Sequence, residues 1–343
     1  MGTAPFASPA SARGSVQDDH LIWSGIPEIE ADLARVRERV LAEAASAGGA
    51  MGDALGRYVA RPGKMLRPGF VLIGAWAGQQ KAGSAASERI VQIAAAIETL
   101  HLATLVHDDV IDDADRRRGE PSLHALHGRK QAVLMGDYLL SRCFSMIGEG
   151  TSRENALRLA KATGHLVRSE INQMYHPGDK TFSRRAYLRR IAGKTAMLFG
   201  LSLVTGGAEN KARPREIVLL GRIGYGVGMS FQIIDDILDF TAHAHALGKP
   251  VASDLRSGIY TLPVIEAVAR DPQVRPLVVP APSGSVALEA AVAAVDRAGG
   301  IARARMTART YTVRAQREIA RLSDGRQREA LTLVTDRLLG REY

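Results

Sequence analysis

The chain is organised around one stretch, His107-Asp108-Asp109-Val110-Ile111-Asp112-Asp113-Ala114-Asp115-Arg116-Arg117-Arg118-Gly119. It follows the largely apolar run 97–106 and places five aspartates ahead of three arginines. On a helix, Asp108 and Asp112 lie one turn apart, about 6 Å along the axis, with Asp109 beside them. Carboxylates this close repel one another and raise one another's pKa, so the pattern favours bound cations. Mg²⁺ suits such a site, because it takes one or two carboxylates together with waters and substrate phosphates.

A second cluster repeats the spacing more than a hundred residues later. Taken alone, the first stretch is equally typical of a solvated acidic helix end followed by a basic turn. The stretch Phe231-Gln232-Ile233-Ile234-Asp235-Asp236-Ile237-Leu238-Asp239-Phe240, however, interrupts a strongly apolar helical pattern. An unpaired charge there would be costly. Two such clusters in one helical chain therefore indicate function rather than surface charge.

These two motifs, in this order, resemble those of the trans-type isoprenyl diphosphate synthases, the polyprenyl synthetase family. Further similar segments lie between residues 63 and 263. The resemblance implies an all-α fold, a single large bundle of about ten or more helices around a central cavity. It also implies a Mg²⁺-dependent prenyltransferase that condenses isopentenyl diphosphate with an allylic diphosphate, either farnesyl or geranylgeranyl diphosphate. Three Mg²⁺ ions and a homodimer are expected by the same resemblance.

Composition agrees with a large helical domain. The chain has 343 residues with 46% hydrophobic but only 5% aromatic content, which favours helix packing over sheet. The formal charge is +9, but no basic stripe with interleaved aromatic residues is present, which argues against a nucleic-acid partner. Cys143 is the only cysteine, so an intrachain disulfide and a cysteine-based zinc site are excluded.

The chain divides into a tail and one domain. Residues 1–22 are rich in Ala, Ser, Gly and Pro and are predicted to be disordered. The resemblance implies that residues 23–343 form a single helical prenyltransferase domain. No charge-free apolar run reaches the roughly 18–20 residues of a membrane span, and the N-terminus lacks a signal-peptide pattern. We therefore expect a cytoplasmic protein that is not transmembrane, although a lipid-like product gives a reason for peripheral membrane contact.

Periodicity predicts where the helices lie. Residues 29–60 are expected to form two helices that are separated at Gly48-Gly49, and prolines indicate an extended connection over 267–285. Ser183 is a predicted N-cap. The other helices are expected at 87–106, 131–147, 153–175, 184–208, 215–240 and, as two or three helices, 285–340. Four glycines weaken the helix at 215–240, and close approach of a neighbouring helix or a ligand chain would justify them.

Residues before the first motif are candidates for the isopentenyl diphosphate site. Lys64 and Arg67, three apart near a helix start, form a plausible anion site, although ordinary surface charge gives the same pattern. Their segment resembles the family's Gly-Lys-x-x-Arg-Pro element, which implies that they hold this diphosphate. His101 is two turns before Asp108 and matches a histidine of that site, whereas a lone histidine on an apolar helix is more often a core residue. Arg118 is assigned to the same diphosphate.

The remaining site residues also follow from the resemblance. The implied metal ligands, which with Lys194 form the catalytic group, are Asp108, Asp109, Asp112, Asp235 and Asp239. The implied ligands of the allylic substrate are Arg117, Gln173, Lys194, Thr195, Gln232 and Lys249. Metals and cations would neutralise the departing diphosphate and promote an allylic cation, which the oriented double bond of the second substrate then attacks. Many members have a second lysine where this chain has Ile259, so the basic shell is expected to be thinner there.

Product length is expected to depend on what lies beneath the first motif. Ala103 and Thr104, five and four residues before Asp108, are small, whereas a bulky aromatic residue there stops elongation early in the family. This favours a product of C30 or longer for a quinone side chain. The alternatives are a geranylgeranyl diphosphate synthase making C20 and a non-catalytic helical partner subunit. A terpene cyclase has no use for Lys64 and Arg67, and a non-catalytic subunit would be expected to lose motif aspartates.

Overall fold

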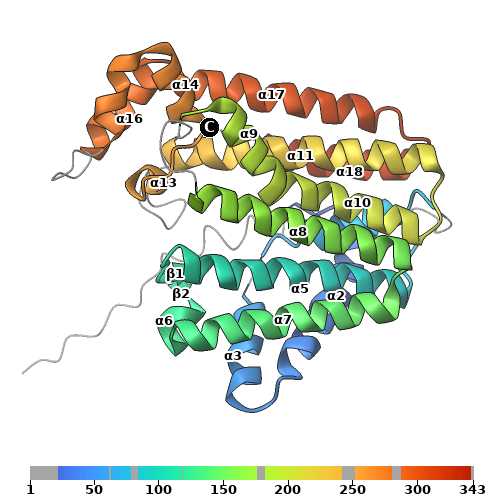
Figure 1. Ribbon diagram of the computed structural model, residues 1–343. Helices are drawn as coiled ribbons and strands as arrows, with labels where there is room; N and C mark the ends of the chain where they lie inside the picture. The colour runs from blue at the N-terminus through green and yellow to red at the C-terminus, as the bar shows by residue number, and fades with distance from the viewer. Residues whose placement is uncertain are drawn as a thin grey trace, which may run out of the picture.

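The computed structural model describes residues 22–61, 63–78, 84–117, 119–175, 182–241, 252–279 and 287–340. The described chain is almost entirely helical, as predicted (Figure 1). Its longer helices are α2 (Pro27–Ala45), α3 (Gly49–Val59), α4 (Leu66–Ala75), α5 (Glu88–Ile111), α7 (Arg129–Gly150), α8 (Arg153–Tyr175), α9 (Arg184–Ile191), α10 (Met197–Glu209), α11 (Pro214–Thr241), α14 (Leu262–Arg270), α16 (Leu288–Arg297), α17 (Gly300–Ile319) and α18 (Gly325–Leu339).

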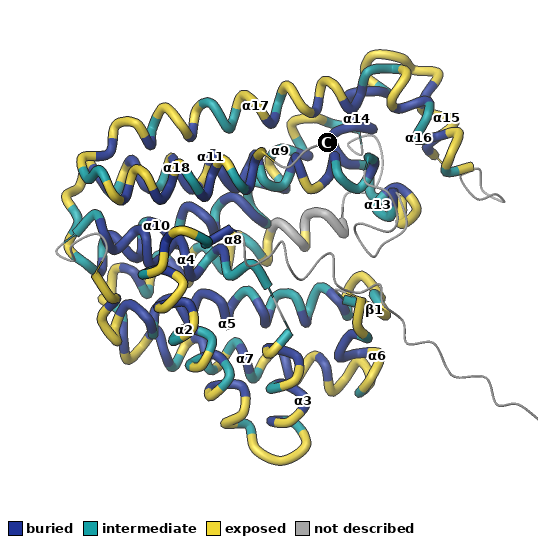
Figure 2. Tube along the Cα trace, turned by 180° about the vertical axis from the view of Figure 1, so that it is seen from behind, coloured by how far each residue is buried: buried dark blue, intermediate teal, exposed yellow. Residues whose placement is uncertain are grey.

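Helix α5 runs through the interior of the bundle. Its sequence is apolar nearly all the way round, which is typical of a helix buried on all sides. The hydroxyl oxygen of Ser87 caps its first turn by accepting from the backbone N–H of Ile90, and the helix ends at Ile111. It packs against α2, α4 and α7, and Figure 2 shows the mostly buried α5 trace between α10 and α7. The first aspartate cluster is therefore placed at the end of a rigid, buried rod.

Glycines bring α10 and α11 into close contact. A Cβ atom at Gly224 would lie 2.6 Å from the Cα of Gly200, and one at Gly228 would lie 2.6 Å from the Cα of Ala196. Real side chains do not approach that closely, so only glycine permits this spacing. Close approach of a neighbouring helix, which we expected of these glycines, is confirmed at both positions.

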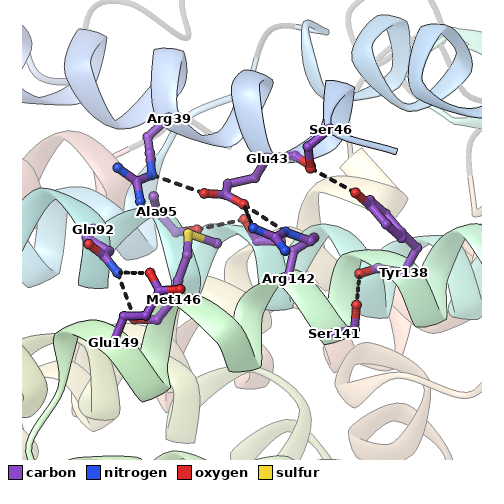
Figure 3. A network of polar contacts seen from close by, with 11 residues as sticks. Arg39, Glu43, Ser46, Gln92, Ala95, Tyr138, Ser141, Arg142, Met146 and Glu149 are labelled. Carbon is purple, nitrogen blue, oxygen red and sulfur yellow. Dashed lines mark hydrogen bonds and ion pairs between the residues drawn. The ribbon is translucent and has the colours of Figure 1, made fainter. Parts of the chain in front are cut away.

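Helix α2 is fastened to α7 by a polar network (Figure 3). The Glu43 carboxylate, only 8% exposed, accepts hydrogen bonds from Arg39 at 3.1 Å and from Arg142 at 2.6 and 2.8 Å. One turn away, the hydroxyl groups of Ser46 and Tyr138 lie 2.8 Å apart. These bonds compensate for burying the Glu43 charge and hold α2 against the outer side of α7.

Most helix predictions are confirmed, with three differences. The break at Gly48-Gly49, the helix at 153–175 and the Ser183 cap agree with the structure. The helix predicted at 184–208 contains a π-helical turn, η1 (Ala192–Ala196). The extended connection at 267–285 was wrong in its first part, because prolines occupy first-turn positions of η2 (Pro272–Val274) and α15 (Arg275–Val278). Ile22, assigned to the tail, is buried, while 1–21 lie outside the described residues.

Three segments are long and apolar enough to cross a membrane by length and composition alone. They are Glu88–Ile111, Arg184–Glu209 and Pro214–Thr241, and their most apolar windows are 72%, 61% and 61% buried within the bundle. Much of their apolar surface therefore packs against other helices of this chain.

Candidate active site

The first aspartate cluster lies where α5 ends and a short hairpin begins. Asp112 is the C-cap of α5, so the helix carries Asp108 and Asp109 in its last turn. The chain then turns into two paired strands, β1 (Arg116–Arg117) and β2 (Glu120–Pro121). The hairpin folds the arginines back toward the aspartates that precede them. The five-residue helix α6 (Leu123–His127) follows, and the ring of its His124 hydrogen-bonds the carbonyl of Ala114 at 2.9 Å.

Arg117 neutralises the most buried carboxylate of this cluster. Asp109 is 1% exposed, and its Oδ1 accepts bonds from Arg117 Nε at 2.6 Å and from the terminal guanidinium nitrogen at 2.5 Å. Burial raises the pKa of Asp109, while the bond from Arg117 opposes that rise. Partial desolvation by the surrounding protein raises the pKa of Asp112 as well, while Lys194 opposes the rise and Asp108 adds to it. The cluster is thus short of positive charge.

The π-helical turn η1 joins the two aspartate clusters. Lys194 Nζ lies 3.3 Å from Asp108 Oδ2 in the first cluster. The hydroxyl of the next residue, Thr195, donates to Gln232 Oε1 on α11 at 2.8 Å. In Figure 1 the C-terminal ends of α5 and α11 lie at the same end of the bundle. A π turn is often found at functional sites, and here it presents two neighbouring residues to two different helices.

A buried network supports the second cluster. Gln232 Nε2 donates to Asp236 Oδ1 at 2.9 Å, and the Tyr187 hydroxyl donates to Asp236 Oδ2 at 2.5 Å. Burial raises the pKa of Asp236 to about 7, against the lowering effect of those two bonds. Thr195, Gln232, Asp236 and Tyr187 thus form one chain of hydrogen bonds that fixes α9 and η1 against α11.

The two outer aspartates of the second cluster have different surroundings. Asp235 is exposed. Asp239 caps the short helix α13 (Ser253–Arg256), because its Oδ1 accepts from the Ser253 N–H at 3.1 Å and hydroxyl at 2.9 Å, and its Oδ2 accepts from the Asp254 N–H at 3.2 Å. These bonds hold α13 against the C-terminal end of α11.

The donor set fits divalent cations that are shared with substrate oxygens. Within the described ranges, no three His, Cys, Asp or Glu side chains come together as a protein-only metal cage. The Oδ2 atom of Asp109 is buried without a hydrogen-bond partner there, and Asp108 and Asp112 raise the negative charge beside it. Sites that hold Mg²⁺ through one or two carboxylates, waters and phosphates need no closed cage. Such ions would supply positive charge for a departing diphosphate.

The predicted isopentenyl diphosphate residues lie at the start of α4 and on α5. The indole N–H of Trp23 donates to the Lys64 carbonyl at 2.7 Å and anchors this loop, and Met65 follows in the left-handed region at φ 48°. The Arg67 guanidinium lies 5.3 Å from the centre of the Phe199 ring, where cation–π attraction fixes its position. His101 is partly buried on α5. Arg118, Lys249 and the side chain of Gln173 lie outside what the structure describes.

Ala103 lies in the buried interior of the bundle. It is 1% exposed, whereas Thr104 is partly buried and its hydroxyl donates to the His101 carbonyl at 2.7 Å. Leu100 and Leu139 are buried on the facing helices α5 and α7. Ala103 is therefore surrounded by protein, and a larger side chain there would have to displace its neighbours.

Two residues of the hydrogen-bond network were not among the predicted site residues. Asp236 lies within the second motif, and its i, i+4 relation to Gln232 places both on one helix face, a signal that was available in the sequence. Tyr187 carried no such signal, because only the packing of α9 on α11 brings its hydroxyl to Asp236.

Comparison with known proteins agrees with this geometry. Residues 50–285 match the model of the polyprenyl synthetase family. The chain belongs to that family. This polyprenyl synthetase is 39% identical over 274 residues to heptaprenyl diphosphate synthase component 2 of Geobacillus stearothermophilus, a match that covers 79% of this chain and 84% of the relative.

Solved structures of similar proteins share the fold of this polyprenyl synthetase. Heptaprenyl diphosphate synthase from Staphylococcus aureus superposes with a TM-score of 0.85 at 29% identity, covering 92% of this chain and 99% of that one. Polyprenyl synthase from Caulobacter crescentus, solved with calcium and isoprenyl diphosphate, gives a TM-score of 0.84 at 29% identity, covering 98% and 100%. The all-α isoprenoid synthase fold and the prenyltransferase class that the motifs predicted are both confirmed.

Proposed function

We propose that this polyprenyl synthetase condenses isopentenyl diphosphate with farnesyl or geranylgeranyl diphosphate to make a trans-polyprenyl diphosphate of C30 or longer, for a quinone side chain. The observation that carries the proposal is the pair Lys194 and Thr195. Lys194 contacts Asp108 of the first cluster, and Thr195 contacts Gln232 beside the second cluster. A diphosphate held near this turn would meet groups from both clusters, which suits ionisation of an allylic diphosphate.

The role of metal is to balance charge at that diphosphate. We propose three Mg²⁺ ions, with Asp108, Asp109, Asp112, Asp235 and Asp239 as protein ligands. The unpartnered Oδ2 of Asp109 and the raised pKa of Asp112 support cation binding at the first cluster. The calcium in the Caulobacter crescentus structure supports a divalent ion in this family. Lys64, Arg67, His101 and Arg118 would orient isopentenyl diphosphate, and Arg117, Gln173 and Lys249 would assist with the allylic diphosphate.

The decisive experiment is an elongation assay. The purified chain is incubated with Mg²⁺, labelled isopentenyl diphosphate and farnesyl diphosphate, and the dephosphorylated products are separated by chromatography. We expect a ladder that ends at C30 or beyond. A sharp C20 product would instead establish the geranylgeranyl alternative. Absence of elongation with farnesyl, geranylgeranyl, geranyl and dimethylallyl primers would contradict the proposal and favour a role as a partner subunit.

Product length is tested at Ala103. Its small side chain, buried on α5, supports a long product, and the similarity to two heptaprenyl diphosphate synthases points the same way. Replacement by phenylalanine (Ala103→Phe) should shorten the main product by at least one isoprene unit, because the ring would displace the side chains packed around Ala103 into the space that we propose for a growing chain. Thr104→Ser, which keeps the hydroxyl and adds no volume, is the control. Identical ladders from Ala103→Phe and the unaltered chain would remove Ala103 from the argument.

Assembly as a homodimer is the favoured arrangement. Apolar side chains are exposed on two successive helices, with Val133, Leu134 and Phe144 on α7 and Leu157, Val167 and Ile171 on α8. Both helices lie on the same side of the bundle in Figure 1, and exposed apolar surface of this kind is typical of an interface. The name of the Geobacillus stearothermophilus relative, component 2, makes a separate partner subunit the second candidate. We place the protein in the cytoplasm, with transient membrane contact during product release.

A further inference from the structure

A groove runs along α17, and no aspartate of either cluster lines it. Its residues on α17 extend over about 22 Å of helix: Arg303, Met306, Thr307, Thr310, Tyr311, Arg314 and Glu318. Two cavities, of about 360 and 520 Å³, open along this stripe and share Tyr311 and Arg314. Both volumes fall in the range of about 300–1,000 Å³ that is usual for small-molecule pockets. We call the two together the α17 groove.

One end of the α17 groove is cationic. Arg184 of α9, Arg303 and Arg314 line the smaller cavity together with one carboxylate, Glu266 of α14. Glu266 is buried and pairs with Arg184 at 2.8 Å and with Arg303 at 2.9 Å. Its single negative charge therefore balances only one of these two positive charges. Arg314 lies over the Tyr311 ring, 5.9 Å from its centre, and forms no ion pair with a carboxylate of the described chain. This end therefore carries excess positive charge.

Hydroxyl groups add further polar atoms at the cationic end. Thr307 accepts a hydrogen bond from Arg184 at 3.3 Å, and Thr310 lies one turn further along the same face of α17. Guanidinium groups beside hydroxyls are the donors that phosphate oxygens prefer. The smaller cavity thus has the chemistry of a site for a phosphate or diphosphate group.

The other end of the α17 groove is apolar. The larger cavity is lined by Ile217, Val218 and Tyr225 of α11, with Tyr311 facing them from α17. Val218 is 52% exposed and Tyr225 41% exposed, so their apolar atoms remain accessible. At the far rim Arg222 and Glu318 lie 3.7 Å apart and offset each other's charge. An apolar chain placed here would cover surface that water now contacts.

We propose that the α17 groove binds a prenyl diphosphate, with the diphosphate among Arg184, Arg303 and Arg314 and the hydrocarbon chain along α11. A ligand with only one of these two groups would occupy only one end of the groove. Inorganic diphosphate would leave the apolar cavity exposed to water, and a plain hydrocarbon would make no contact with the arginines. The assignment of this ligand rests on the proposed function, which makes prenyl diphosphates the substrates and products of the chain.

The test is equilibrium binding of labelled farnesyl diphosphate to the full chain in the presence of EDTA, which removes metal-dependent binding at the aspartate clusters. Arg314→Glu and Val218→Glu place a negative charge at either end of the groove. Each should weaken this binding by at least about tenfold, because Arg314→Glu removes a charge-assisted contact and Val218→Glu places a carboxylate against the hydrocarbon chain. Arg309→Glu is the matched control, because Arg309 is exposed on α17 but lines neither cavity. Inorganic diphosphate should bind at least tenfold more weakly than farnesyl diphosphate.

The outcomes separate the two proposals. If Arg314→Glu and Val218→Glu bind farnesyl diphosphate as tightly as the unaltered chain does, the assignment of the groove is overturned, whatever the elongation assay shows. Loss of binding in these variants, with elongation absent in the unaltered chain, would establish the groove while contradicting the proposed function. In a final experiment, phosphatidylglycerol vesicles compete with labelled farnesyl diphosphate for the groove. If the vesicles compete more strongly than unlabelled farnesyl diphosphate does, the assignment would also be overturned, because the groove would then recognise a membrane surface.

Discussion

At the scale of single residues, the polar contacts between η1 and α11 are the most informative. Thr195 and Gln232 hold each other at 2.8 Å, and Gln232 in turn holds Asp236 at 2.9 Å. Each contact positions the next, so Thr195 acts on the second cluster through Gln232. The resemblance assigned Thr195 directly to the diphosphate, and the structure gives its hydroxyl a protein partner as well.

Removing the Thr195 hydroxyl should therefore reduce turnover. In Thr195→Val the Gln232 amide loses an oriented partner at a cost of about 1 kcal/mol, which corresponds to a five- to tenfold lower kcat in the elongation assay. Thr195→Ser keeps the hydroxyl and should retain at least about half of the activity. If valine and serine variants lose activity equally, the methyl group and not the hydrogen bond is the important feature.

Cys143 offers a prediction about pH. Burial raises the pKa of its thiol to about 12 from an ordinary value of 9.0. At pH 8 only about one molecule in ten thousand would then carry the thiolate, and Cys143 should react with thiol reagents roughly a thousandfold more slowly than an exposed cysteine. The rate should rise about tenfold per pH unit while the fold persists.

The raised pKa of Cys143 also determines how its contribution to folding stability changes with pH. The folded-state pKa is raised, so the contribution of Cys143 to stability is complete below about pH 9 and is lost as the pH rises toward 12. A chain in which Cys143 is replaced by alanine and exposed Thr332 by cysteine is the control and should be labelled fast. Rapid labelling of native Cys143 at pH 8, with no denaturant, would contradict its burial.

At the scale of elements, α11 shows how packing reverses local propensity. A glycine inside a helix costs roughly 1 kcal/mol relative to alanine, yet α11 retains Gly224 and Gly228 because α10 and η1 pack directly on them. The close approach is what allows Thr195 on η1 to reach Gln232 on α11. The close packing of α10 and η1 on α11 therefore also determines the geometry of the site.

The glycines of α11 and α3 should respond to alanine in opposite directions. Gly224→Ala places a methyl group 2.6 Å from the Gly200 Cα and should lower the free energy of unfolding by about 1–3 kcal/mol. Gly56→Ala on α3 meets no atom within 4 Å and should raise it by about 0.4–1 kcal/mol. Urea denaturation of both variants measures the difference. A stabilised Gly224→Ala would show that α10 and α11 separate more easily than their spacing implies.

At the scale of the whole molecule, α7 and α8 carry exposed apolar side chains that the other helices of the bundle do not cover. Its interior already includes the apolar residues of α5, α10 and α11, whereas Leu134 is 63% exposed and Phe144 46% exposed. A second copy of the chain, placed against this surface, would cover them.

The homodimer is tested by charge substitution on that surface. Leu134→Asp combined with Phe144→Asp should convert a particle of twice the chain mass into a monomer, because burying two unpaired carboxylates is costly. Light scattering coupled to gel filtration measures the mass. Leu277→Asp on α15, also at an exposed leucine, is the control and should remain dimeric. A wild-type chain that is monomeric alone but pairs with a separate subunit would replace the homodimer by the two-component arrangement.

By itself, the sequence determined the family, the all-α class and the motif residues. Those properties depend on local patterns, namely helical periodicity and carboxylates at fixed spacing such as Asp108, Asp109 and Asp112. Only the tertiary structure decided that Asp236 is buried against Tyr187, that Asp239 caps α13, and that Lys194 and Thr195 contact different clusters. Each of these contacts joins residues that are at least 14 positions apart in the chain. Their geometry depends on how helices pack, which local sequence patterns do not encode.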